Sequence, residues 1–190
     1  MLTWVTKLTQ KFEERAVASK AAYHMLEKYY QDTIENEATL ANVTAKDHIL
    51  CIGGGTCPLS AILFHQVTGA KVTVIDHNGA CIPKARQVIK ALGLVDKVQV
   101  LHQEATCKKL DLASFTVVHL ALQVSPLNQV LAFIKDQAAP GTKILVRRPK
   151  KTLKSLYCRL SQGVLAGCPY TTHRRCNIGH TLLYVKEAAA

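Results

Sequence analysis

The chain has 190 residues, of which 48% are hydrophobic and 19% are charged, a balance typical of one soluble globular domain. It contains no run of about 18 apolar residues, so no membrane-spanning helix is predicted. Glu13, Glu14 and Arg15 stand where a secretory signal would continue its apolar stretch, and we therefore expect a cytoplasmic protein. Seven scattered cysteines, with no CxxC among them, then indicate reduced thiols.

The formal net charge is +11, and much of the excess lies between Lys143 and Arg175, a stretch without a single acid. Such a basic region suits a nucleic acid or an anionic small molecule, and it is equally typical of a solvated surface. Charge alone therefore leaves the partner open.

Apolar side chains at helical spacing predict a helix over residues 3–40, after which strands and helices alternate. Pro58 is suited to start the first of the later helices and Gly69 to end it, and Ser125 is an expected N-cap. In chain order we predict strand 49–52, helix 58–68, strand 71–76, helix 82–93, strands 97–103 and 115–122, helix 125–138, strand 142–148, an amphipathic helix 151–165 and a closing hairpin over 170–187.

This alternation predicts an α/β fold: a Rossmann-like, seven-stranded, doubly wound sheet with N-terminal helices and a C-terminal antiparallel hairpin. In such sheets ligands bind at the carboxyl ends of the strands. The stretch CIGGGTCPLS, residues 51–60, lies at that edge, because it follows the first strand and precedes a helix. Gly53, Gly54 and Gly55 permit a tight turn and close approach of a ligand, although helix–strand packing alone would also explain them.

Further residues indicate which cofactor this turn holds. Asp76 ends the second strand, where an acid accepts hydrogen bonds from ribose hydroxyls. Pro58 stands where a dinucleotide motif needs its third glycine, and the chain has no GKS or GKT of a P-loop. Glu104 and Ala105 follow the third strand, where Rossmann-like methyltransferases hold adenine, so we predict S-adenosylmethionine. The predicted cofactor-binding residues are Ile52, Gly53, Gly54, Gly55, Pro58, Asp76, His77, Glu104, Ala105 and Leu120.

Several other reactive side chains receive structural interpretations. Cys51 replaces the acid that methyltransferases carry before the glycines, and its thiol supplies no charge at neutral pH, because a free cysteine has a pKa near 8.5. Both Cys51 and Cys57 are therefore interpreted as small buried residues. Arg147 or Arg148 would grip a carboxylate or face solvent, and His119 is expected in the core. The spacing of Cys168, His173, Cys176 and His180 matches no zinc pattern, so no metal site is predicted.

The glycine turn also resembles one family more closely. Gly53, Gly55, Pro58, Leu59 and Ser60 match the G-x-G-x-x-P-L-[ST] turn of nicotianamine synthases and their bacterial and archaeal relatives. GTKILVRRP resembles their fifth strand and YTTHRRCNIGHTLLYVKE their last hairpin, so the resemblance covers roughly residues 45–187. It implies the class I S-adenosylmethionine-dependent methyltransferase fold, together with transfer of the aminobutyrate arm of S-adenosylmethionine to make metal-chelating amines.

That resemblance also implies a tyrosine and a glutamate near the acceptor amine, both from the region before the first strand. Tyr23, Tyr29 and Glu27 are available there, and we take Tyr30 and Glu35 as the catalytic candidates. We accordingly divide the chain into an N-terminal helical segment, residues 1–44, which packs over the cofactor site, and an S-adenosylmethionine-binding domain, residues 45–190; together they form one compact unit.

These observations predict an S-adenosylmethionine-dependent transferase, in the first place a methyltransferase acting on a small molecule. Aminobutyrate transfer to an amine, as in metallophore biosynthesis, is the alternative; a non-catalytic S-adenosylmethionine-binding module and an RNA methyltransferase are further ones. A nucleic-acid acceptor is not favoured, because LALQVSPLN after the fourth strand lacks the Asn/Asp-Pro-Pro-aromatic element of base-amino methyltransferases. The oligomeric state is left open, with a homodimer as one option.

Overall fold

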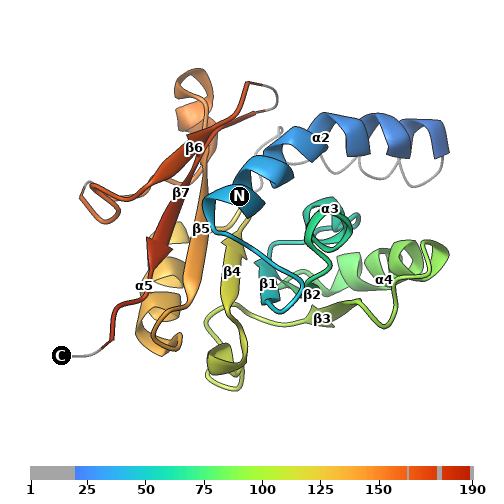
Figure 1. Cartoon of the computed structure of the whole chain (residues 1–190), viewed down its shortest axis with the longest axis horizontal. Coiled ribbons are helices and arrows are strands. Elements are labelled where there is room, and N and C mark those ends of the chain that lie inside the picture. Colours follow the sequence, from blue (N-terminus) through green and yellow to red (C-terminus); the bar gives the residue numbers. More distant parts are fainter. Residues whose placement is uncertain (1–19, 162, 175–176, 189–190) are drawn as a thin grey trace.

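The structure, a computed structural model, describes residues 20–161, 163–174 and 177–188 (Figure 1). The first part of the helix predicted over residues 3–40 lies outside this range, and the rest forms α2 (Lys20–Leu40). Within the described residues, no helix combines the length and the hydropathy needed to cross a bilayer.

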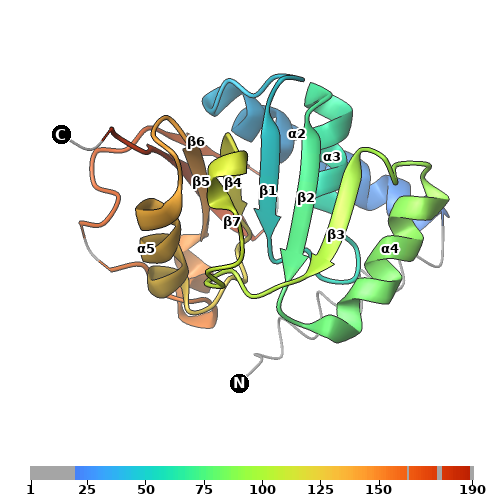
Figure 2. The ribbon, with the colours of Figure 1, turned by 90° about the horizontal axis from the view of Figure 1, so that it is seen from below.

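The centre of the molecule is a seven-stranded sheet in the order β3-β2-β1-β4-β5-β7-β6, which confirms the predicted α/β fold (Figures 1 and 2). The first five strands run parallel, whereas β7 runs antiparallel to both β5 and β6 and so forms the closing hairpin. The strands are β1 (His48–Ile52), β2 (Lys71–Asp76), β3 (Val98–His102), β4 (Val117–Leu120), β5 (Lys143–Pro149), β6 (Tyr170–Thr172) and β7 (Ile178–Val185).

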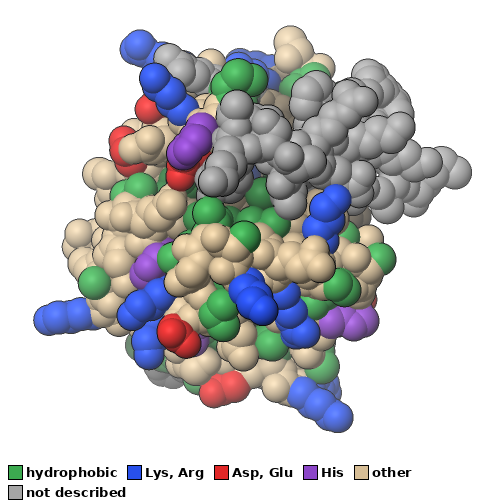
Figure 3. Space-filling view, turned by 90° about the vertical axis from the view of Figure 1, so that its right-hand side faces the viewer, with side chains coloured by type: hydrophobic (Ala, Val, Ile, Leu, Met, Phe, Trp, Pro, Cys, Tyr) green, Lys and Arg blue, Asp and Glu red, His purple; other side chains and the backbone are tan. Residues whose placement is uncertain are grey.

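Helices cover both faces of this sheet. The connecting helices are α3 (Leu59–Thr68), α4 (Ile82–Ala91) and α5 (Leu127–Gln137), and the 3-10 helices are η1 (Gly79–Cys81), η2 (Leu112–Ser114) and η3 (Lys151–Leu156). One hydrophobic cluster joins α2, α3 and α4 to one face, and a second joins α5 to the other. At the molecular end shown in Figure 3, basic and acidic side chains are interspersed with hydrophobic ones.

The alternation of side chains along β5 determines where its two arginines point. Leu145 belongs to the cluster on the α2 side, whereas Ile144 and Val146 belong to the cluster on the α5 side. Because successive side chains of a strand face opposite sides of the sheet, Arg147 lies on the α2 side and Arg148 on the α5 side.

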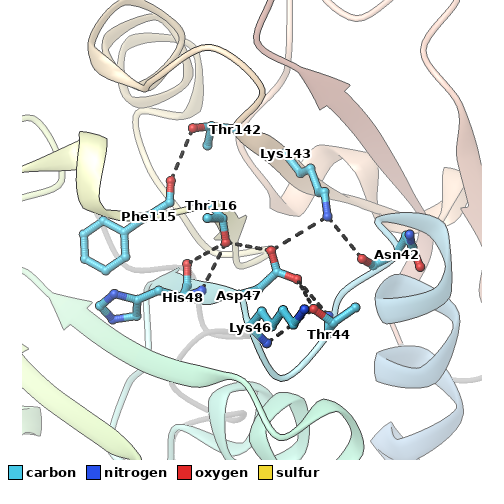
Figure 4. Close-up of polar contacts among 9 residues, drawn as sticks. All are labelled: Asn42, Thr44, Lys46, Asp47, His48, Phe115, Thr116, Thr142 and Lys143. Atoms are coloured by element: carbon cyan, nitrogen blue, oxygen red, sulfur yellow. Dashed lines mark hydrogen bonds and ion pairs between the residues drawn. The ribbon is translucent and has the colours of Figure 1, made fainter.

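A polar network joins the loop after α2 to the amino ends of the strands (Figure 4). The Asp47 carboxylate accepts hydrogen bonds from the Thr116 hydroxyl at 2.7 Å and from the Thr44 backbone at 2.8 Å, and it lies 3.8 Å from the Lys143 ammonium. Burial raises the pKa of Asp47, but these hydrogen bonds outweigh that effect and hold the pKa below its ordinary value. The network anchors the end of α2 against β4 and β5, opposite the carboxyl ends of the strands.

Helix ends agree with the prediction at α3 and disagree at α5. Gly69 ends α3 in the left-handed conformation, at φ +75°, and its N–H donates to the His65 carbonyl at 2.8 Å. Ser125 is not the N-cap of α5, because the helix begins at Leu127 after Pro126 and has no side-chain cap. The Ser125 hydroxyl lies instead 3.6 Å from the Cys158 thiol.

The prediction of an amphipathic helix over residues 151–165 is wrong. Among the described residues of this segment, η3 is the only helix, none of its residues is buried, and the backbone becomes extended at Tyr157. The extended chain separates the apolar side chains of this segment: Tyr157 lines a cavity, Cys158 both lines that cavity and packs against the α5 cluster, and Leu160 packs against the α5 cluster. Tertiary contacts on two different surfaces therefore override the helical periodicity.

We predict that Gly54→Ala destabilises the protein by about 1–3 kcal/mol, because a Cβ on Gly54 would overlap the Cγ1 methyl of Val74 on β2. In a Val74→Ala background the same change should cost less, since the methyl that it meets is gone. Urea denaturation of the four variants of this cycle measures both costs. Equal costs in the two backgrounds would show that the cost of a Cβ at Gly54 does not come from the Val74 methyl.

Candidate active site

A cavity of about 1590 Å³ opens at the carboxyl ends of β1 to β5, under the N-terminal half of α2. It exceeds the roughly 300–1,000 Å³ typical of small-molecule sites, so it has room for more than one ligand. Its walls include the glycine turn, the end of β2, the loop after β3, the segment after η3 and the tyrosines of α2.

The glycine turn places a carboxylate beside its backbone. Gly53 and Gly55 adopt the left-handed region, at φ +88° and +60°, which residues with a Cβ rarely enter. The Gly55 N–H donates to Asp76 Oδ2 at 2.8 Å, and the Asn78 N–H donates to Asp76 Oδ1 at 2.9 Å. Each carboxylate oxygen keeps a further lone pair for a ligand hydroxyl. The turn therefore orients Asp76 at the wall of the cavity.

Cys51, just before the turn, is a buried thiol. Burial raises its pKa to about 12, and the nearby Glu37 carboxylate acts in the same direction, while the Arg147 guanidinium opposes them. At neutral pH the side chain is therefore uncharged and is not a thiolate nucleophile. Cys51 and Cys57 are both buried in the core cluster, as their interpretation from the sequence expects.

A buried ion pair lies behind the cavity wall. Arg147 of β5 donates from Nε to Glu37 Oε1 and from Nη2 to Glu37 Oε2, both at 2.7 Å. Its third nitrogen, Nη1, donates to the Ser60 hydroxyl in the first turn of α3 at 2.8 Å. The Thr181 hydroxyl of β7 also donates to Glu37 Oε1, at 2.6 Å. The carboxylate that Arg147 grips is thus supplied by α2 of the same chain.

Two histidines lie next to this ion pair. His119 Nε2 of β4 is 3.5 Å from Glu37 Oε2, and His173 Nε2 is 2.9 Å from the Thr181 hydroxyl. Burial alone would raise the pKa of Glu37, but the charge and hydrogen bonds of Arg147 hold it well below its usual range. Burial is also the main reason why the pKa of each histidine is lowered. The cluster therefore holds one carboxylate, one guanidinium and two neutral imidazoles at neutral pH.

Solved structures resemble this chain over most of its length. A mutant of the nicotianamine synthase MtNAS, in complex with S-adenosylmethionine, is 25% identical and matches with a TM-score of 0.78 over 96% of this chain and 73% of that chain. An RNA methyltransferase from Salinibacter ruber, in complex with S-adenosyl-L-homocysteine, is 20% identical and matches with a TM-score of 0.66 over 84% of this chain and 93% of that chain. This chain has the S-adenosylmethionine-dependent methyltransferase fold.

Curated relatives carry a more specific name. An L-histidine 2-aminobutanoyltransferase from Yersinia pestis is 27% identical over 150 residues, which cover 78% of this chain and 51% of that protein. A protein of the same name from Pseudomonas aeruginosa is 26% identical over 118 residues, 61% of this chain and 44% of that protein. The chain thus spans about half the length of these relatives or less. No protein-family model matches it.

Within this methyltransferase fold, the cavity brings together most of the residues predicted to bind the cofactor. Ile52, the three glycines, Pro58, Asp76, His77, Glu104 and Ala105 all line it. Leu120 does not, because it is fully buried in the α5 cluster; the neighbouring Ala121 lines the cavity in its place. His102, which the sequence did not single out, also lines the cavity, and its Nε2 is 3.0 Å from the His77 carbonyl.

The two catalytic candidates, Tyr30 and Glu35, lie on different faces of α2. Tyr30 lines the cavity, whereas Glu35 is exposed, accepts a hydrogen bond from Gln31 at 2.9 Å and lies beside a separate hollow. Five residues of an α-helix rotate about 140°, so the two side chains point in different directions. Glu37, seven residues after Tyr30, returns to the same face, and that spacing is the signal that would have revealed it.

The tail residues weighed for zinc do not assemble into a site among the described residues, which hold no group of three His, Cys, Asp or Glu able to bind a metal ion. His173 is directed at Thr181, and His180 packs against Tyr170 with ring centroids 6.1 Å apart. Cys176 lies outside the described residues.

The lowered pKa values of the two buried histidines predict a pH-dependent stability. In the unfolded chain each imidazole takes up a proton near pH 6.5, whereas in the folded chain burial lowers its pKa, so that protonation needs a lower pH. The free energy of unfolding should therefore fall between about pH 7 and pH 5, by up to about 1.4 kcal/mol per pH unit for each histidine. Replacing His119 by leucine should flatten this slope, whereas the exposed His24→Gln should not. Urea denaturation across this range tests it, and parallel curves for wild type and His119→Leu would contradict it.

Proposed function

We propose that this chain binds S-adenosylmethionine in the cavity and transfers a group from it to a small-molecule amine. The observation that carries the proposal is the glycine turn, whose backbone N–H fixes the Asp76 carboxylate at the cavity wall. The match to MtNAS in complex with S-adenosylmethionine supports the choice of cofactor.

The residues present fit this cofactor. Asp76 keeps free lone pairs for ribose hydroxyls, and Glu104 with Ala105 offers a polar edge and a small side chain where adenine would lie. Gly53 and Gly55 leave the backbone accessible to the methionine part. Because the Cys51 thiol carries no charge, we expect backbone carbonyls of the turn to accept hydrogen bonds from the amino group.

We propose transfer of the aminobutyrate arm of S-adenosylmethionine as the reaction, with methyl transfer as the second candidate. Bound S-adenosylmethionine supplies an electrophilic carbon next to its sulfonium. When the amine nitrogen bonds to that carbon, the carbon–sulfur bond breaks, its electron pair stays on sulfur and the amine loses one proton. The two L-histidine 2-aminobutanoyltransferases and MtNAS support the first reaction. The Salinibacter ruber enzyme, of which this chain covers 93%, supports the second.

Tyr30 is our candidate for the group that orients the acceptor amine. It lines the cavity and lies within electrostatic range of Arg147. Glu35, exposed on another face of α2, is not placed to share this role without a movement of the helix. The division at residue 44, the small-molecule acceptor and the cytoplasmic location stay predictions.

Product analysis distinguishes the two transfers. Incubation with S-adenosylmethionine and free amino acids as acceptors should release methylthioadenosine if the aminobutyrate arm moves, and S-adenosylhomocysteine if the methyl group moves. Chromatography with mass detection separates these thioethers. We expect methylthioadenosine, and the appearance of neither product with any amine would overturn the proposal of catalysis.

Binding of the cofactor should depend on Asp76. Asp76→Asn keeps the size of the side chain but loses its charge and half of its acceptor capacity, so we expect affinity for S-adenosylmethionine to fall roughly tenfold or more. The exposed Asp136→Asn is a matched control that should bind as wild type. Isothermal titration measures both, and an unchanged affinity of Asp76→Asn would remove the proposed binding mode.

A further inference from the structure

The Glu37–Arg147 ion pair connects the two sides of the cavity. We propose that Glu37 is a positioning residue that locks α2 to the sheet and thereby holds Tyr30 in place at the acceptor side. The inference rests on the proposed transfer reaction for its functional consequence, and on the contacts of Glu37 for the lock itself.

The contacts of Glu37 fix α2 in more than one direction. Oε1 accepts from Arg147 on β5 and from Thr181 on β7, while Oε2 accepts from Arg147 and faces His119 on β4. The side chain is fully buried. Apolar neighbours on α2, such as Ile34 and Ala38, pack without directional preference, whereas a bidentate pair defines both the rotation and the register of the helix. Glu37 thus determines which face of α2 meets the cavity.

Tyr30 lies two helical turns before this lock, on the same face, roughly 10 Å along the axis. Before Tyr30, Leu26 still packs against the core cluster, whereas Met25, on another face of the helix, is 76% accessible. The polar contacts of α2 with β4, β5 and β7 described above are made by Glu37, on the C-terminal side of Tyr30. A small rotation at Glu37 is carried along the rigid helix to the phenol.

The same guanidinium also reaches the cofactor side. Arg147 Nη1 donates to Ser60, which belongs to the first turn of α3 and follows the glycine turn by only a few residues. Arg147 itself lines the cavity. One buried ion pair therefore relates the position of the acceptor-side helix to that of the cofactor turn.

The charge of Glu37 matters as well as its shape. The groups that face Arg147 are Glu37 and Tyr30 on α2, Cys51 on β1, His119 on β4 and His173 before β7. Glu37 carries the negative charge that compensates the guanidinium, because Arg147 holds the pKa of this carboxyl well below its usual range. If Glu37 loses its charge, the guanidinium acts uncompensated on the Tyr30 phenol and favours its ionisation.

The test compares Glu37→Gln with Asp32→Asn, which makes the same charge change on the exposed face of α2. We expect Glu37→Gln to bind S-adenosylmethionine within about twofold of wild type but to lower kcat by roughly 10²-fold, because misplacement by about 1 Å has such an effect. NMR of protein with ¹³Cζ-labelled tyrosine, assigned with Tyr30→Phe, should show Tyr30 ionising roughly one pH unit lower. The control should show none of these changes.

A double variant guards against a folding defect. Glu37→Leu with Arg147→Met removes both charges and replaces them by apolar volume, a change that buried ion pairs often tolerate. This variant should fold and keep Tyr30 ionising near its wild-type pH, yet transfer slowly. A folded double variant with wild-type kcat, or a Glu37→Gln variant with unchanged Tyr30 ionisation and kcat, would overturn the inference.

The labelling experiment needs no cofactor, so it tests the positioning role of Glu37 independently of the proposed transfer reaction. If wild-type protein does not bind S-adenosylmethionine, the proposed function is wrong, while the downward shift of Tyr30 ionisation in Glu37→Gln still supports the lock. If the cofactor binds and is consumed but Tyr30 does not respond to Glu37, the transfer reaction stands and the positioning role is refuted.

Discussion

Burial of one carboxylate is the constraint on which the rest of this molecule depends. Glu37 is 0% exposed and Arg147 5%, and neither charge is tolerable alone in such surroundings. Their pairing requires α2 to lie across β5, and the remaining acceptor capacity of the carboxylate is met from β7. The position of the helix over the cavity thus follows from the need to satisfy a charge, in addition to the apolar packing around Ile34.

The same constraint explains the cysteine at the start of the glycine turn. Cys51 lies close enough to Glu37 and Arg147 for both charges to influence its pKa. An acid at this position would bring a second carboxylate toward Glu37 in a buried environment, where like charges repel strongly. A neutral thiol avoids that repulsion. The departure from the methyltransferase pattern is therefore consistent with an acid supplied from α2, on the other side of the arginine.

Local patterns account for what the sequence predicted correctly. Runs such as Lys71–Asp76 and the glycine turn are short stretches whose periodicity and neighbours already define strand, turn and helix. The helical spacing from Tyr30 places Glu37 on the cavity side of α2, but its pairing with Arg147 was not predictable from local patterns, because the two residues are 110 positions apart. The prediction of a helix after Lys150 was wrong for a related reason. The apolar side chains of this segment are divided between the cavity and the α5 cluster, an arrangement that no helical period describes.

The hydrogen bond from Thr181 to Glu37 spans 144 residues, so the centre of the site is assembled from opposite ends of the chain. During synthesis, α2 leaves the ribosome long before β7, and the carboxylate must stay hydrated until the last strands arrive. Contacts between such distant residues close large loops and slow folding. Loss of β7 would leave the Glu37–Arg147 pair but remove the Thr181 hydroxyl, so the final hairpin supplies the contact that completes the coordination of the buried carboxylate.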